Sequence, residues 1–423
     1  MLKFLNICLI LLVIFYFSVD TITPCTMIMA ENDSLVYAGN NEDYSDPNTF
    51  VWFINKNEDR KYGCIYLGYS NLWPQGGMNE AGLCFDAFAT APNPVPVINF
   101  ENLPLFTSNP MDQVMSSCSS VLEAVTMMQQ HDLSFMTNFQ LMLVDKLGNS
   151  AIIEGEEVIW KNDYYQVCTN FYQSNPSLGG YPCWRYDTAV ELFEDHQDSV
   201  SIPLFRDILN ATHQEGQYPT LYTNIYDLHD GKVYLYYNHY YDEVVIFDLL
   251  EGLGRGNREY QILDLYSNLI IQSPDDGAII ESNSATLIWE GEGEKYHLLY
   301  SLDPDFNDYE EVEINMSDYS GGGSAVISLG LVLFIPFILS KNNTVIRKSI
   351  LIVPMIFISL FTHSCNLNNI TSSNEKTDIT SNGNSVSVTI HSLEADTTYY
   401  WQVKAERNGP FISEGPINKF TVK

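Results

Sequence analysis

The sequence predicts an α+β fold followed by an all-β module. Up to about residue 270, β-rich runs come first, helical periodicity fills the middle, and hairpin turns recur at 146–149 and 229–231. Strands and helices that do not alternate favour an α+β layout over a βαβ winding. Beyond residue 273 only short strand-like runs occur, which predicts the all-β module.

The first part of the chain supplies both kinds of element. Apolar and β-branched runs predict strands at 26–29, 35–38, 51–54, 64–69, 139–144, 151–154, 221–227 and 232–237. Apolar residues at helical spacing predict helices at 111–130, 187–194, 202–212 and 258–269.

The second part opens with a Pro-Asp-Asp-Gly turn, and strands are predicted at 285–290, 296–301, 386–391, 399–405 and 419–423. It resembles a fibronectin type III module. Trp289 falls where such modules place an early core Trp, and the segment 393–399 matches their tyrosine corner with Tyr399. The alternative, another β-sandwich, changes little about function.

Two apolar runs, 325–339 and 350–361, interrupt that module and enclose a loop containing Lys341, Arg347 and Lys348. A basic loop between apolar runs predicts a hairpin with a cytoplasmic tip, so we expect membrane association through 325–361. Each run is shorter than the roughly 20 residues that a span needs, and each contains a proline. The alternative is an artefact in the sequence.

Composition limits the functional classes. The chain has 423 residues, which predicts two or three domains. Its net charge of -33 argues against nucleic-acid binding, which needs a basic surface. Its eight cysteines form neither a CxxC motif nor a Cys/His cluster, so no metal site is expected. One pair is free to form a disulfide after export, but the spacing does not say which.

The N-terminus predicts export. Lys3 precedes a short apolar run, so residues 1–18 are expected to be a signal peptide that directs the protein to an extracellular or periplasmic location. The alternative is an uncleaved anchor. Pro24 argues against direct cleavage by signal peptidase before Cys25. We therefore expect a cut near Val19 and self-removal of the remaining propeptide.

Cys25 is the candidate nucleophile. A cysteine that becomes the first residue carries an α-amine whose unperturbed pKa is roughly 7.7–8.0, so one residue supplies both nucleophile and base. The alternative is a structural or disulfide-bonded cysteine.

The residues that follow favour the catalytic interpretation. Cys25 is followed by Thr-Met, and segment 39–43 reads Gly-Asn-Asn-Glu-Asp. This closely resembles the opening of the choloylglycine hydrolase and penicillin V acylase family. The resemblance covers about 25–270 and implies a four-layer αββα N-terminal-nucleophile hydrolase sandwich. It also implies hydrolysis of a linear amide C–N bond in a small N-acyl substrate, without cofactor or metal. Members commonly form tetramers, so the resemblance allows a homo-oligomer, but the sequence does not fix the oligomeric state.

The resemblance assigns further residues. Asp43 would hold the α-amine of Cys25. Asn40 stands where the family has an arginine, a departure that removes a charge favouring thiolate and puts the family's substrate contacts in doubt. Asn79 lies in a Gly-Met-Asn-Glu-Ala-Gly-Leu turn that marks the fold, and it is assigned with Asn40 to substrate binding.

Later motifs complete the implied site. The side chain of Asn170 and the backbone N–H of Ala89 would stabilise the oxyanion, and Ala89 would also contact substrate. Arg185, in a Trp-Arg-Tyr segment, would be the site arginine. Taken singly, each has an ordinary interpretation, such as a turn residue, a cap or a surface charge. Their order along the chain favours the site.

The expected organisation is therefore a signal peptide and propeptide at 1–24, a catalytic domain at 25–270, and an all-β sandwich module at 271–423 interrupted by the apolar hairpin. Two rival hypotheses remain. One is a Cys–His hydrolase in which His239 pairs with Cys84 or Cys168. The other is a non-catalytic surface adhesin built on a degenerate hydrolase fold.

Overall fold

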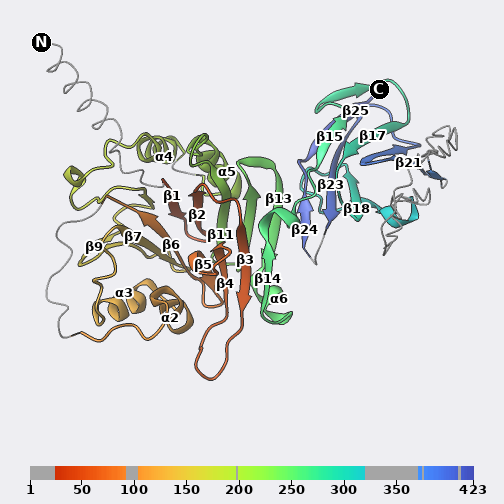
Figure 1. Cartoon of the computed structure of the whole chain (residues 1–423). Coiled ribbons are helices and arrows are strands. Elements are labelled where there is room, and N and C mark those ends of the chain that lie inside the picture. The colour runs from red at the N-terminus through yellow and green to blue at the C-terminus, as the bar shows by residue number, and fades with distance from the viewer. Residues whose placement is uncertain (1–23, 92–102, 197–198, 320–369, 374–375, 408–410) are drawn as a thin grey trace, which may run out of the picture.

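A computed structural model describes residues 24–91, 103–196, 199–319, 370–373, 376–407 and 411–423 (Figure 1). A larger N-terminal part and a smaller C-terminal part lie side by side, with β13 next to β24 where they meet. The signal peptide and propeptide up to residue 23 and the apolar hairpin at 325–361 lie outside the described residues, and so do Cys8 and Cys365.

The strands of the N-terminal part are β1 (Thr26–Glu31), β2 (Val36–Asp43), β3 (Thr49–Ile54), β4 (Cys64–Tyr69), β5 (Pro74–Asn79), β6 (Leu83–Ala89), β7 (Phe139–Asp145), β8 (Ser150–Glu154), β9 (Glu157–Trp160), β10 (Tyr165–Cys168), β11 (Thr220–Asp227), β12 (Lys232–Tyr237), β13 (Tyr240–Asp248) and β14 (Arg258–Gln261). Its helices are α2 (Pro110–Ser117), α3 (Val121–Gln129), α4 (Trp184–Asp195), α5 (Ile202–Ala211) and α6 (Leu249–Gly254), with short 3₁₀ turns η2 (Pro176–Leu178) and η3 (Ile262–Leu265).

The C-terminal part contains β15 (Ile270–Ser273), β16 (Ala278–Ile280), β17 (Ala285–Glu290), β18 (Lys295–Ser301), β19 (Glu310–Asn315), η4 (Met316–Asp318), β20 (Ile370–Ser373), β21 (Thr377–Asn382), β22 (Ser385–Ile390), β23 (Thr397–Glu406), β24 (Ile412–Glu414) and β25 (Asn418–Val422).

Three sheets organise the described residues. The long sheet has 12 strands and runs β10-β1-β2-β11-β12-β13-β24-β23-β18-β19, with β25 on β23 and β16 on β25. The second sheet has eight strands in the order β14-β3-β4-β5-β6-β7-β8-β9, and the third has five in the order β15-β17-β22-β21-β20. Every pairing is antiparallel except β16 with β25.

Alternating side chains of β1 show how the core is divided. Met27 and Met29 belong to the apolar core shared by the long and second sheets. Ile28 and Ala30 point to the opposite face and pack with residues of α4 and α5. Burial on both faces explains why β1 is a nearly continuous apolar run rather than an alternating one. Helices α2 and α3 pack on the second sheet through a separate cluster.

The predicted four-layer αββα sandwich is wrong. The structure is mainly β, with 44% of residues in strands and 17% in helices, and its described residues hold only five α-helices beside large antiparallel sheets. One cause is that the long sheet continues across β13 and β24 into the C-terminal part and so extends beyond the helices that pack on it.

Misread helical periodicity is the second cause. The predicted helix at 258–269 is strand β14 followed by η3, because Tyr260 and its neighbours pair with β3. The predicted helix at 111–130 is divided at Cys118, where the backbone is extended, and Ser120 caps a new helix. The remaining predicted strands and helices of the N-terminal part occur at or near their expected positions.

The strands predicted after residue 273 occur as β17, β18, β22, β23 and β25. Trp289 is fully buried in the core of this part. The hydroxyl of Tyr399 accepts a hydrogen bond of 3.0 Å from the backbone N–H of Glu394. These contacts suit a β-sandwich, and the fibronectin type III assignment stays a prediction. No helix among the described residues is long and apolar enough to cross a membrane.

Candidate active site

Strand register brings the candidate residues together. Thr26 pairs with Asn41 in β2, and Met27 pairs with Cys168 in β10. Extending both registers by antiparallel steps places Cys25 opposite Glu42 on one side and Asn170 on the other. Residues far apart in the sequence therefore meet at one end of β10, β1 and β2, near the edge of the long sheet.

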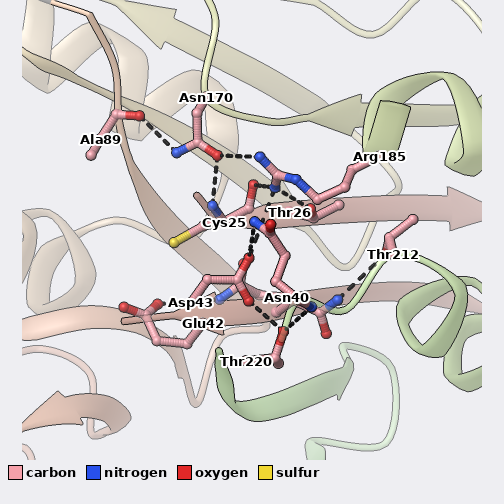
Figure 2. A network of polar contacts seen from close by, with 12 residues as sticks. Cys25, Thr26, Asn40, Glu42, Asp43, Ala89, Asn170, Arg185, Thr212 and Thr220 are labelled. Atoms are coloured by element: carbon pink, nitrogen blue, oxygen red, sulfur yellow. Dashed lines mark hydrogen bonds and ion pairs between the residues drawn. The ribbon is translucent and has the colours of Figure 1, made fainter. Parts of the chain in front are cut away.

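A polar network holds the backbone of Cys25, which is 4% exposed (Figure 2). Its backbone N–H donates to Asn170 Oδ1 at 2.6 Å. Arg185 donates to the carbonyl of Cys25 and, at 2.6 Å, to Thr26 Oγ1. Both backbone groups of Cys25 are thus fixed by side chains from distant segments.

The orientation of the Asn170 amide follows from its partners. Its Oδ1 accepts from Cys25 N and, at 2.9 Å, from Arg185 Nη2. Both partners are donors, so the acceptor oxygen must face them. Its Nδ2 consequently points toward Ala89 and donates to that carbonyl at 2.7 Å.

Arg185 occupies the first turn of α4 and is 4% exposed. Its Nη1 lies 4.0 Å from Asp43 Oδ2, so the guanidinium connects Asp43, Asn170 and the Cys25 backbone. Figure 2 shows this bridging position between the carboxylate and the amide. The arginine and the carboxylate that the sequence singled out do meet.

Asp43 is fully buried and lies at the end of β2. Its carboxylate accepts hydrogen bonds from the Thr220 hydroxyl and, at 3.2 Å, from Gln214 Nε2. Burial raises the pKa of Asp43 to about 7, although the nearby Arg185 and these hydrogen bonds act to lower it. Asn170, and not Asp43, is the group that hydrogen-bonds the Cys25 nitrogen here.

Two successive acidic residues of β2, Glu42 and Asp43, both lie beside the site, on opposite faces of the long sheet. Asp43 pairs with Thr220 and Glu42 with Tyr222, so Leu221 is the extra residue in β11. Bulges re-aim side chains and are frequent beside active sites. The extra residue belongs to β11, so β2 keeps its ordinary alternation: Glu42 points to the cavity and Asp43 points to Arg185 and Gln214.

Glu42 was not singled out by sequence reasoning, although it lies within the quoted segment 39–43. It is 3% exposed and accepts a hydrogen bond from the Tyr69 hydroxyl. Burial raises its pKa to about 7. Asn40 is fully buried next to it and places Nδ2 at 3.5 Å from Glu42 Oε2, a long contact, while its own Oδ1 has no hydrogen-bond partner among the described residues.

A cavity of about 580 Å³ opens beside Cys25. Its walls combine the thiol residue, one carboxylate and many aromatic or amide side chains. The lining residues are Cys25, Glu42, Tyr44, Tyr69, Asn71, Trp73, Pro74, Gln75, Ala87, Phe88, Ala89, Asn109, Pro110, Met111, Phe135, Asn138, Phe139 and Leu141. Figure 2 shows the sulfur of Cys25 and the carboxylate of Glu42 pointing to the same side, away from Arg185.

The environment of the thiol keeps its proton in place. Burial raises the pKa of Cys25 well above its ordinary value, and the nearby carboxylates of Glu42 and Asp43 raise it further. Asn40, which lies beside Glu42, carries no charge that would oppose this effect. A thiol in this environment needs a base to lose its proton.

The other predicted residues have different positions. Ala89 lines the cavity at the end of β6. The Asn79 amide donates to the carbonyls of Met115 and Cys118 and accepts from the N–H groups of Ala81 and Leu83. It holds the end of α2 against the β5–β6 turn and is absent from the described wall of the cavity.

The cysteines and histidines of the rival hypothesis lie elsewhere. Cys84 and Cys168 are buried in the core between the sheets. His239 stacks on His213, with ring centroids 5.0 Å apart. The described cysteines are all free thiols. No group of three or more His, Cys, Asp or Glu side chains within the described ranges could hold a metal ion.

Comparison with known proteins gives eight solved chains that resemble this one in structure. No protein-family model matches the chain. No curated protein matches it either. The solved structure of penicillin V acylase from Agrobacterium tumefaciens resembles it with a TM-score of 0.41 and 17% sequence identity, over 50% of this chain and 82% of that chain. A likeness at this level carries no argument about activity, so the function must be argued from the site.

Proposed function

We propose that the chain is an amide hydrolase in which Cys25, exposed as a new N-terminal residue, attacks the carbonyl of an N-acyl substrate. The observation that carries this proposal is the clamp on Cys25. Its nitrogen lies 2.6 Å from Asn170 Oδ1 and its carbonyl is bound by Arg185, while the residue itself lines a cavity of about 580 Å³. A merely structural cysteine needs neither a dedicated acceptor on its nitrogen nor a substrate-sized cavity beside its sulfur.

Removal of residues 1–24 would turn the clamped N–H into an α-amine at the same position. Asn170 Oδ1 would then orient the amine, and Arg185 would keep that acceptor in place at 2.9 Å. The amine has an ordinary pKa of roughly 7.7–8.0 and can take the proton of the thiol near neutral pH. The raised pKa of Cys25 makes such a base necessary.

The reaction then follows in balanced steps. The thiol sulfur bonds to the substrate carbonyl carbon while the α-amine takes its proton. Collapse of the tetrahedral intermediate breaks the C–N bond, and the same proton passes to the leaving amine. Water, deprotonated by the α-amine, then bonds to the thioester carbonyl carbon, the C–S bond breaks to release the carboxylic acid, and the amine returns the proton to the Cys25 sulfur. Hydrogen bonds from Asn170 Nδ2 and the Ala89 N–H are the proposed oxyanion donors, and one such donor is worth about 3–4 kcal/mol.

The proposed substrate is a small N-acyl amide with an apolar acyl group. Phe88, Phe135, Phe139 and Leu141 line the cavity and offer an apolar wall to such a chain. We also propose export and self-removal of the propeptide. Mass spectrometry of the active enzyme should find Cys25 as the first residue, and retention of Pro24 in fully active enzyme contradicts the mechanism.

The decisive test is amide turnover by matched variants. Purified enzyme is offered a panel of N-acyl amides, including penicillin V, conjugated bile salts, acyl-amino acids and acyl amides with neutral or cationic amine portions, with amine release as the readout. Cys25→Ser should lose turnover by at least about 10³-fold, whereas His239→Ala should retain it. An aldehyde should condense with the N-terminal Cys25 to a thiazolidine. Full turnover by Cys25→Ser, or loss only in His239→Ala, rejects the assignment.

A further inference from the structure

The described lining of the cavity beside Cys25 includes an acidic side chain but no basic one. Of the described residues that line it, Glu42 is the only charged one, and they include no Lys, Arg or His. The Glu42 carboxylate is 3% exposed and faces the side to which the Cys25 sulfur points. The carboxylate is therefore at the reacting end of the cavity.

Aromatic rings surround this carboxylate. The Tyr69 hydroxyl donates to Glu42, and the rings of Tyr69 and Tyr44 lie 4.7 Å apart between centroids at 44°. Trp73, which is 53% exposed, adds a third ring to the same wall. A carboxylate beside aromatic faces is the chemistry that binds ammonium groups, through charge-assisted hydrogen bonds and cation–π attraction.

The neighbouring buried acids and the net charge of the whole chain also favour a cationic ligand. Asp86 and Asp43 are buried near Glu42; the charge of Asp43 raises the pKa of Glu42, and the charge of Glu42 raises the pKa of Asp86. Of these three acids Asp43 is the one that pairs with Arg185, so an incoming cation would relieve the repulsion at Glu42. The whole chain has 53 acidic against 20 basic residues, a net charge of -33. Such a field concentrates cations and repels anions.

We propose that the substrate is an N-acyl amide whose amine portion carries a cationic ammonium group, held between Glu42 and the rings of Tyr44 and Tyr69. This inference rests on the proposed amide hydrolase function and assigns its substrate class. It also predicts rejection of amides whose amine portion is a carboxylate or sulfonate, because such groups would approach Glu42 with no described cation on the cavity wall.

The test uses three decanoyl amides that differ only in terminal charge: those of ethylenediamine, ethanolamine and glycine. All release decanoate, which is measured by mass spectrometry. For the full-length enzyme, kcat/KM for the ammonium substrate should exceed that for the carboxylate substrate by ~100-fold, the size expected from combined attraction and like-charge rejection at a desolvated site. A ratio of one or less overturns the inference while leaving the hydrolase function standing.

Variants test which residues cause the preference for the ammonium substrate over the carboxylate substrate. Glu42→Gln should reduce the ratio by ~10-fold or more, and Tyr44→Leu should reduce it several-fold. Glu191→Gln removes the same charge from the exposed face of α4 and should leave the ratio unchanged. Because the ratio compares two substrates on one enzyme, a general loss of active protein cancels. An unchanged ratio in both Glu42→Gln and Tyr44→Leu rejects the proposed ammonium site.

A binding measurement separates the two proposals. Calorimetry with Cys25→Ala compares phenethyltrimethylammonium with its uncharged carbon isostere. One outcome is that no decanoate is released from any of the three amides, while the ammonium compound binds to Cys25→Ala and not to Cys25→Ala/Glu42→Gln. This outcome contradicts the hydrolase function but supports the cation site. Absence of both turnover and ammonium binding overturns both.

Discussion

Arg185 shows how much of the site depends on single residues. It lies in the first turn of α4, yet its contacts reach β1, the end of β2 and the loop after β10. It opposes the desolvation of Asp43 and orients the amide that holds Cys25. The sequence identified this residue, but its role as the link between three segments depends on the packing of α4 against the long sheet.

Replacing Arg185 with Met should therefore damage both stability and turnover. The change leaves Asp43 buried without its cation, which costs about 3–5 kcal/mol for a broken buried pair. It also releases the Asn170 amide, so amide turnover of the folded fraction should fall ~100-fold or more. Urea unfolding followed by circular dichroism measures the loss in the free energy of unfolding. Arg206→Met, which breaks an exposed pair with Asp207, should change stability by less than about 0.5 kcal/mol. Equal effects of the two variants contradict the bridging role.

The pH dependence of stability should report on Asp43. Its pKa is about 7 in the folded chain and near its ordinary 3.8 when unfolded, so between these values the folded state binds more protons. Stability therefore falls as pH rises from about 4 to about 7 and levels off above 7. Asp43→Asn lacks this titration. The free energy of unfolding of the wild type minus that of Asp43→Asn, measured by urea unfolding from pH 4.5 to 8, should decline by on the order of 1–3 kcal/mol. A difference that rises with pH contradicts the assignment.

At the scale of elements, two irregularities lie near the site. In β11, Leu221 is an extra residue between Thr220, which pairs with Asp43, and Tyr222, which pairs with Glu42. The break between α2 and α3 is held by Asn79, whose amide satisfies the carbonyls of Met115 and Cys118. Neither irregularity can be predicted from hydrophobic periodicity. A bulged strand has the same pattern as a regular one, and two successive capped helices have the pattern of a single helix.

Asn79→Ala should be strongly destabilising. It leaves two buried carbonyls and two turn N–H groups without partners, and we expect a loss of about 2–3 kcal/mol in the free energy of unfolding. Thermal unfolding is the measurement. The matched control is Asn32→Ala, since the Asn32 side chain bonds exposed turn N–H groups of Ser34 and Leu35. A loss below that of the control would refute the structural role of Asn79.

At the scale of the molecule, the C-terminal part is not a separate appendage. Strand β24 pairs with β13, so the long sheet runs through both parts. Phe411, just before β24, belongs to the core between the long and second sheets and contacts Phe247 with ring centroids 4.5 Å apart. It also stacks on Phe53 at 6.1 Å. The proposed division at residues 270 and 271 thus separates parts that share a sheet and an apolar core.

Phe411→Ala should weaken the N-terminal part, although residue 411 lies far along the chain. Loss of a buried Phe costs about 3–5 kcal/mol. Hydrogen exchange followed by mass spectrometry should show faster exchange in peptides of β3 and β13. Ile417→Ala changes a half-exposed side chain between β24 and β25 and should leave those peptides unaffected. Confinement of the Phe411→Ala effect to the C-terminal strands would contradict the shared core.

The sequence alone determined most strands and the helices near 187–194 and 202–212, because periodicity is written along the chain, and it also supplied the candidate residues of the site through local motifs such as Cys25 with segment 39–43. The helix predicted at 258–269 was wrong, because pairing of β14 with β3 overrides the helical spacing of the apolar residues in that segment.

Only the tertiary structure decided what surrounds Cys25. Glu42 lies beside Cys25 through the β1–β2 register, Asn170 meets the Cys25 nitrogen through the β1–β10 register, and the long sheet grows through β24. These outcomes depend on non-local pairing and on the burial of charge, and neither is encoded by the spacing of residues within one segment.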